Sequence, residues 1–169
     1  ENMPPNDMSS YECTINLDTM EWEPWSPPSW KYPKMEVEFS TLLVPTVDST
    51  SASFLLSNIH KQRAPVMMIG GSGTAKTTTA QMFFDAMDAE SMLIKRVNFS
   101  SATTSGMFQA AVEGELDQRG GKNFGPPSGK SMTLFLDDVS MPEVNKWGDQ
   151  PTLELVRQLV ETGGVCFLD

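Results

Sequence analysis

Residues 66–77 read Val-Met-Met-Ile-Gly-Gly-Ser-Gly-Thr-Ala-Lys-Thr, an apolar run followed by a glycine-rich turn. The apolar run, Val66 to Ile69, has the length of a buried strand, and the residues after the turn predict a helix from about Lys76 to Met87. A strand, a glycine-rich turn and a helix in this order are typical of α/β proteins. We therefore expect a parallel sheet with helices on its faces.

The turn matches the GxxxxGK[ST] phosphate-loop pattern, also called Walker A, with one departure. Ala75 stands where the second glycine is usual, and its methyl group is tolerable if its φ stays negative. Inward-facing backbone N–H groups would bind phosphates, Lys76 would add a charge for the β- and γ-phosphates, and Thr77 a hydroxyl for Mg²⁺. A purely structural turn has no need of a lysine followed by three threonines. The residues predicted to hold ATP or ADP here are Gly70, Gly71, Ser72, Gly73, Thr74, Ala75, Lys76, Thr77 and Thr78.

A second motif supplies acids. The apolar run Met132 to Leu136 predicts a strand, and Asp137 and Asp138 follow it directly, in the manner of a Walker B motif. We assign Thr77 and Asp137 to Mg²⁺, and Asp138 to the catalytic position that orients or deprotonates the attacking water. Glutamate is common at that position, and aspartate is shorter by one CH₂, so it reaches roughly 1.5 Å less far; a displacement of that order can lower a rate about 100-fold. The sequence therefore supports nucleotide binding more strongly than hydrolysis.

The remaining sequence continues the alternation of strands and helices. Further helices are expected at 53–60, 104–119 and from Pro151 to Gly163, further strands at 92–99 and from Val165, and a Gly-, Pro- and Lys-rich loop at 120–130. Within that loop, residues 125–131 read Gly-Pro-Pro-Ser-Gly-Lys-Ser and superficially repeat the phosphate loop. The glycine spacing is one residue short, however, and the two prolines lack N–H donors. We therefore expect an ordinary surface loop, from which Lys130 could still meet a partner.

The first 50 residues differ from the rest in composition. They hold nine acidic residues against Lys31 and Lys34, so −7 of the net charge of −10 lies there, with seven of the 12 prolines and three of the four tryptophans. Disordered chains are poor in aromatic residues, so we expect an ordered, extended arm that packs on a neighbouring surface. The acidic balance argues against nucleic acid as a partner, because phosphates demand a basic patch. No stretch approaches the roughly 18 consecutive apolar residues of a membrane-spanning helix, so no membrane partner is expected.

Five motifs, taken in order, resemble those of dynein heavy chains. They are Leu42 to Asp48, the loop Gly70 to Thr77, Asn98 to Thr104, Phe124 to Pro127 and Phe135 to Pro142. The resemblance extends from about Asp18 to the end of the chain and is to the third AAA+ module of the motor ring in its axonemal form. The alanine in the loop and the Asp-Asp pair also resemble that module.

The resemblance implies a P-loop NTPase fold of the AAA+ type and a regulatory ATP-binding module in a microtubule motor. Residues 1–40 would form the connecting arm and residues 41–169 a partial AAA+ core, truncated before the sensor strand, an arginine and the helical lid. Val44 and Pro45 would lie in the stretch that passes the adenine. Implied partners are neighbouring AAA+ modules, dynein intermediate and light chains, and microtubules, in the cytoplasm and cytoskeleton at the axoneme of a cilium or flagellum. The isolated chain is expected to bind ATP weakly and to show negligible turnover.

Two other functions remain open. A small P-loop phosphoryl-transfer kinase would need an acceptor pocket and a mobile basic lid, and the sequence has no arginine-rich lid. A structural module that retains nucleotide without turnover is compatible with the short acid Asp138.

Overall fold

The computed structural model describes residues 3–5, 7–32, 38, 42–121 and 123–164. Contacts divide the chain into two units, Glu1–Leu55 and Leu56–Asp169, and each is described by itself. The helix α1 (Val47–Lys61) begins in the first unit and ends in the second. No helix within the described ranges is long and apolar enough to cross a membrane.

The first unit contains a small antiparallel hairpin of β1 (Cys13–Ile15) and β2 (Trp22–Pro24). Its turn is held by the Asn16 side chain, whose Oδ1 accepts hydrogen bonds from the amides of Asp18 at 2.9 Å and Thr19 at 3.2 Å. Residues 7–32 contain no helix, in agreement with Pro24, Pro27 and Pro28, which disfavour helical structure there. Trp25, directly after the hairpin, makes an aromatic contact with Phe54, and the centroids of the two rings are 5.9 Å apart.

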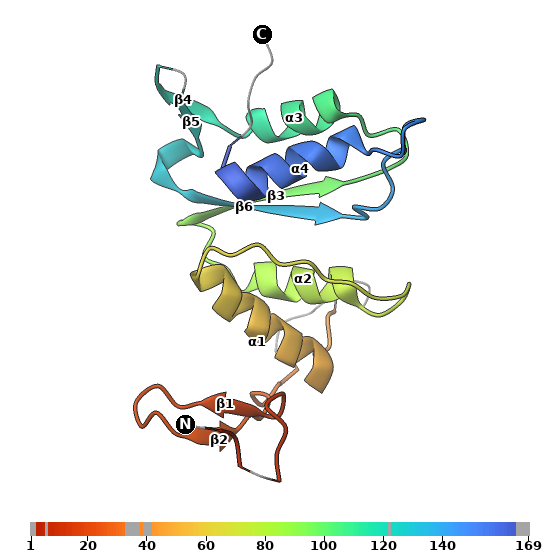
Figure 1. The fold of residues 1–169 in the computed structure, drawn as a ribbon. Coiled ribbons are helices and arrows are strands. Elements are labelled where there is room, and N and C mark those ends of the chain that lie inside the picture. The colour runs from red at the N-terminus through yellow and green to blue at the C-terminus, as the bar shows by residue number, and fades with distance from the viewer. Residues whose placement is uncertain (1–2, 6, 33–37, 39–41, 122, 165–169) are drawn as a thin grey trace. The chain divides into compact units, whose positions relative to one another are not determined.

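The second unit is built on two parallel strands with helices on both faces. β3 (Met92–Asn98) pairs with β6 (Ser131–Asp137) in a register that places Asn98 opposite Asp137. Figure 1 shows α2 (Lys76–Asp85) below this pair and α3 (Ser105–Glu113) and α4 (Pro151–Thr162) together above it. Parallel strands need such cover because both of their faces are buried.

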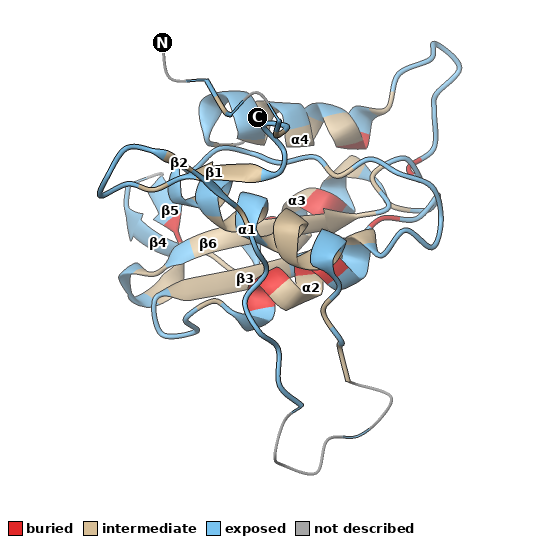
Figure 2. Ribbon diagram, turned by 90° about the horizontal axis from the view of Figure 1, so that it is seen from below, coloured by how far each residue is buried: buried red, intermediate tan, exposed pale blue. Residues whose placement is uncertain are grey.

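The alternation of side chains along the strands separates two apolar clusters. On the α2 face, Ile94 and Phe135 pack against the buried Phe83 and Phe84. On the other face, a larger set from β3, β6, α3 and α4 surrounds the fully buried Phe108. Figure 2 shows the buried positions on α2, α3 and α4 as red segments. Because successive residues of a strand point to opposite faces, Asp137 shares the α2 face with Phe135.

Local signals explain where the helices of this unit begin and end. Thr104 caps α3, its hydroxyl accepting a hydrogen bond from the Met107 amide at 3.3 Å. Pro151 opens α4 at the position where a missing N–H costs nothing, and Gly163 ends it with φ 68°. Both ends of α4 agree with the sequence prediction.

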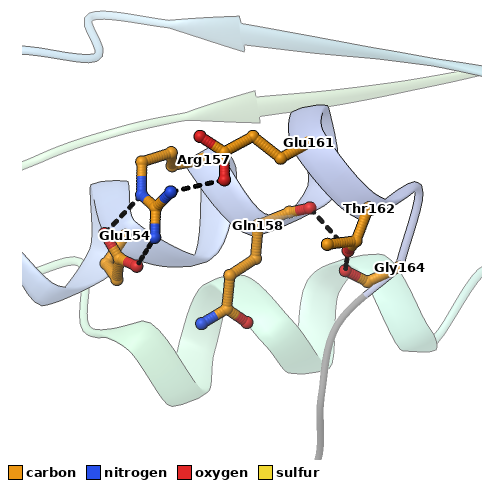
Figure 3. A network of polar contacts seen from close by, with 6 residues as sticks. All are labelled: Glu154, Arg157, Gln158, Glu161, Thr162 and Gly164. Atoms are coloured by element: carbon orange, nitrogen blue, oxygen red, sulfur yellow. Dashed lines mark hydrogen bonds and ion pairs between the residues drawn. The ribbon is translucent and has the colours of Figure 1, made fainter.

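The outer face of α4 carries a charged network (Figure 3). The Arg157 guanidinium donates to Glu154 at 2.5 and 2.9 Å and also to Glu161, and these bonds raise the pKa of Arg157. All three side chains are about half exposed, so the network contributes little to stability. In Figure 3, Gln158 points the other way, toward α3, and its buried Oε1 has no hydrogen-bond partner among the described residues.

Three sequence predictions need correction. The strand expected at Val66–Ile69 is absent, and the side chains of Met67 and Ile69 are 73% and 87% exposed. An apolar run becomes a strand only by hydrogen bonding to a neighbour, and β6 is paired with β3 alone among the described residues. The helix expected at 53–60 is longer, because it begins at Val47.

The helix expected at 104–119 is shorter, since α3 ends at Glu113 and Gly114 follows. Residues 117–120 instead form β4 (Asp117–Gly120), which pairs with β5 (Asn123–Gly125) in a second hairpin. The single turn η2 (Pro127–Gly129) then leads to β6. Part of the expected loop at 120–130 is therefore regular structure, which arises from cross-strand pairing that local helical spacing does not reveal.

The strand expected from Val165 lies outside the described residues.

Candidate functional site

The glycine-rich loop, residues 70–77, leads directly into α2. Its last two residues, Lys76 and Thr77, are the first residues of the helix. A helix N-terminus presents free backbone N–H groups and the positive end of the helix dipole, which favour an anion. The first turn of α2 contains no acidic residue that would offset this field.

The backbone of the loop alternates in handedness. Gly73 has φ 75° and Ala75 has φ 58°, whereas Thr74 between them is not in the left-handed region. Alternation of this kind turns successive N–H groups to one side and creates a concave anion-binding surface. The condition under which the Ala75 methyl group is tolerable, a negative φ, is therefore not met, because this loop places a left-handed residue directly before Lys76.

The ammonium group of Lys76 bonds within the loop itself. Its Nζ donates to the carbonyl oxygens of Gly70 at 2.9 Å and Gly71 at 2.6 Å and lies 3.3 Å from the hydroxyl of Thr74. The Thr74 hydroxyl in turn donates to the Gly71 carbonyl at 2.9 Å. These bonds hold the positive charge against the carbonyl oxygens of the loop. The structure thus joins four of the predicted residues, Gly70, Gly71, Thr74 and Lys76, by hydrogen bonds within the loop.

The loop and the acidic strand end are joined by one hydrogen bond. The Thr77 hydroxyl donates to Oδ2 of Asp137 at 2.9 Å, although the two residues are 60 positions apart in sequence. This contact follows from the fold, because Asp137 ends β6 on the face that α2 covers. The carboxyl end of a parallel strand is also where α/β proteins usually bind their ligands.

Asp138 continues the chain with an unusual backbone. Its φ is 54°, its amide donates to Oδ1 of Asp137 at 3.1 Å, and its carbonyl accepts from the Met141 amide at 2.9 Å. Its side chain is exposed, and the carboxylate makes no hydrogen bond or ion pair with the described residues. Aspartate is several-fold enriched at positive φ among non-glycine residues. The backbone conformation therefore gives a physical reason for aspartate at this position.

The residues of the loop and strand end fit a magnesium nucleotide. The donors suited to phosphates are backbone amides and an ammonium group, and the oxygens suited to Mg²⁺ are those of Thr77 and Asp137. When bound, Mg²⁺ would neutralise charge on the β- and γ-phosphates. No cluster of three or more His, Cys, Asp or Glu side chains that could hold a metal occurs in the described ranges. Mg²⁺ needs no such cluster, because it is usually held by one or two protein oxygens with phosphates and water.

The other predicted residues are less connected. Ser72 and Thr78 are exposed in the loop and the first turn of α2, and no side-chain contact ties them to the described site residues. Val44 and Pro45 belong to the first unit, so their assignment to the adenine stays a prediction. Sequence reasoning gave no role to Asn98, which lies opposite Asp137 at the end of β3 and on the same face. The signal available was a polar residue that ends a strand beside the acidic strand end.

Comparison with known proteins identifies the family of the chain. Residues 30–167 match the family model of the P-loop containing dynein motor region. The chain is 42% identical to the dynein gamma chain of the flagellar outer arm of Chlamydomonas reinhardtii. This alignment extends over 175 residues and covers 99% of the chain. It is 47% identical over 151 residues, 88% of the chain, to mouse dynein axonemal heavy chain 5. It is 41% identical over 167 residues, 97% of the chain, to human dynein axonemal heavy chain 8.

The chain spans only 3% to 4% of the length of these relatives. The match nevertheless contains both the phosphate loop and the acidic strand end. The chain therefore belongs to the P-loop containing dynein motor region family and is similar to axonemal dynein heavy chains over most of its length.

Proposed function

We propose that this region is the regulatory third AAA+ module of a dynein heavy chain and binds Mg-ATP or Mg-ADP at residues 70–78. The observation that carries the proposal is the hydrogen bond between Thr77 and Asp137, which joins the phosphate loop to the acidic end of β6. A nucleotide held there would contact both α2 and the end of β6. Its loss or hydrolysis would therefore change the contacts of both elements. Such a coupling is what a module that gates motor activity needs.

In this proposal each residue has one task. The amides of 71–77 and the Lys76 ammonium bind phosphate oxygens, and Thr77 and Asp137 orient Mg²⁺. Asp138 is placed to accept a proton from, or orient, the attacking water. Its short side chain and exposed carboxylate support slow hydrolysis. Residues 1–40 act as the arm that connects to the preceding module, residues 41–169 as the nucleotide-binding core, and Val44 and Pro45 pass the adenine.

At the level of the whole protein, we propose a microtubule motor at the axoneme of a cilium or flagellum. Its partners would be the neighbouring AAA+ modules and the dynein intermediate and light chains. The names of the relatives, which are flagellar and axonemal dynein chains, support this location.

A second function, retention of nucleotide without turnover, is favoured by one observation. The Asp138 carboxylate has no partner in the described part of the chain to hold it in a productive position. A catalytic carboxylate usually needs such support to keep its geometry.

The test measures bound nucleotide and turnover in the full-length protein. In Lys76→Ala, nucleotide bound at this module should be lost; unchanged occupancy would show that the phosphate-loop assignment is wrong. In Asp138→Asn, nucleotide should remain bound while hydrolysis at this module and motility decline. If both stay unchanged with nucleotide bound, the non-hydrolysing function replaces the regulatory one.

A further inference from the structure

The residue directly before the phosphate-loop lysine has a backbone that its side chain disfavours. Ala75 lies at φ 58° and ψ 22°, in the left-handed region, and carries a Cβ atom. For an L-residue, that conformation brings Cβ too close to the following carbonyl oxygen. Glycine adopts the same backbone without this clash.

The conformation of Ala75 is fixed from two sides. Its carbonyl accepts a hydrogen bond from the Thr79 amide at 2.8 Å, so it must point along α2. On the other side, the alternation with the left-handed Gly73 turns the loop amides inward. Ala75 occupies the helix N-cap position but has no side chain that could bond the free amides there. The left-handed backbone is thus required by the cradle, and the alanine side chain only opposes it.

The surroundings of Ala75 offer no compensation for this strain. The residue is exposed, and it lies outside both apolar clusters. Its methyl group therefore gains no packing in the described structure that would offset the conformational cost. A strained residue of this kind at a binding loop is a reason to look for a functional effect.

We propose that Ala75 sets the nucleotide release rate of this module by making the closed phosphate cradle less populated than a glycine would. This inference rests on the proposed nucleotide-binding function. A ligand that binds one loop conformation loses apparent affinity in proportion to the population of that conformation. The strain at Ala75 lowers that population, so phosphates are held less tightly and nucleotide exchanges faster.

The test substitutes Ala75→Gly in the full-length protein and measures release of a fluorescent ATP analogue in a chase with unlabelled ATP. Release from this module should slow about threefold to fivefold, because the relieved clash outweighs the added freedom of glycine. In an Ala75→Gly/Lys76→Ala double variant this slow phase should be absent, which assigns it to this site. Ala75→Val, whose branched side chain tolerates the left-handed region worst, should accelerate release.

The matched control is Ser128→Gly, which relieves a left-handed non-glycine residue at φ 57° outside the site. It should leave release unchanged, and an equal slowing would overturn the proposal by revealing a general stability effect. The proposal also fails if the Ala75→Gly protein releases nucleotide at the wild-type rate or faster, provided that the Lys76→Ala protein no longer binds nucleotide at this module. If Lys76→Ala retains nucleotide normally, it is the proposed function that fails.

Discussion

Two glycine-rich loops of this chain end in a lysine followed by a hydroxyl residue, yet only one has the geometry of a phosphate site. The first, residues 70–77, enters a helix, whereas the second, residues 125–131, enters the strand β6. Both contain two left-handed residues. In the first loop these alternate, at Gly73 and Ala75, and in the second they are consecutive, at Ser128 and Gly129.

The two lysines show the consequence. The Lys76 ammonium lies among the carbonyls of its own loop, whereas Lys130 donates to the Ala89 carbonyl at 2.8 Å, away from its loop. Pro126 and Pro127 also remove two amides from the second loop. Composition alone therefore does not make a phosphate site. Alternating handedness and a following helix supply the inward-facing amides.

The largest effect is expected from the strand-end acid that only the first loop contacts. In Asp137→Asn, the affinity for nucleotide in the presence of Mg²⁺ should fall about 10- to 100-fold, because the amide is a poorer metal ligand and alters the bond from Thr77. Affinity measured in excess chelator should change little. Titration of a fluorescent nucleotide with and without Mg²⁺ checks this, and equal losses in both conditions would contradict a metal role.

The next effect concerns the first turn of the phosphate loop. A Cβ atom added at Gly70 would lie 3.0 Å from the Thr74 hydroxyl oxygen, whereas one added at Gly71 would lie 4.0 Å from the nearest atom. Gly70→Ala should therefore cost about 1 kcal/mol of overpacking, or about fivefold in nucleotide affinity. Gly71→Ala is the matched control and should stay within about twofold. Similar losses of nucleotide affinity in both variants would mean that the close approach to Thr74 does not determine the effect of Gly70→Ala.

A substitution in the second loop, residues 125–131, should change the stability of the chain and leave nucleotide binding unchanged. Lys130→Ala removes the bond to the Ala89 carbonyl and should lower the free energy of unfolding by about 1 kcal/mol. Lys130→Arg keeps a donor and should recover part of this loss. Denaturant unfolding of the 169-residue chain measures the change. A drop in nucleotide affinity of the full-length Lys130→Ala protein would contradict the separation of the two loops.

The smallest effect is on the carboxylate near Lys130. The pKa of Asp88 is held below its ordinary value of 3.8, mainly by the hydrogen bond from the Glu90 amide and then by Ser91, with Lys130 the least of the causes. The stability that this carboxylate contributes is therefore present above pH 3.8 and is lost as the pH falls through the lower folded pKa. Lys130→Ala should raise the pKa only slightly. An NMR titration of the Asp88 carboxyl group checks this, and a return to the ordinary value would mean that Lys130 dominates.

Local patterns predicted much of the second unit. The helix after the loop, the strand ending at Asp137 and both ends of α4 follow from apolar periodicity and from Pro151 and Gly163. The run at 66–69 misled prediction, because a strand depends on a partner elsewhere in the chain. The hairpin of β4 and β5 was missed for the same reason.

The sequence predicted which residues form the candidate site but not the backbone conformation of two of them. The motif identified Lys76, Thr77 and Asp137, since their chemistry is tied to residue type. It did not reveal that Ala75 and Asp138 are left-handed, because neither residue type demands that conformation. Backbone handedness at a non-glycine residue is imposed by the neighbouring helix and loop, and it becomes visible only in three dimensions.

One experiment compares nucleotide binding by the two loops directly. Backbone hydrogen exchange of the full-length protein, measured with and without Mg-ATP, reports on both loops at once. We expect that amides of residues 71–77 become protected and that those of residues 128–131 do not change, with the protection lost in Lys76→Ala. Protection at 128–131, or none at 71–77 while this module holds nucleotide, would show that the two loops do not differ in this way.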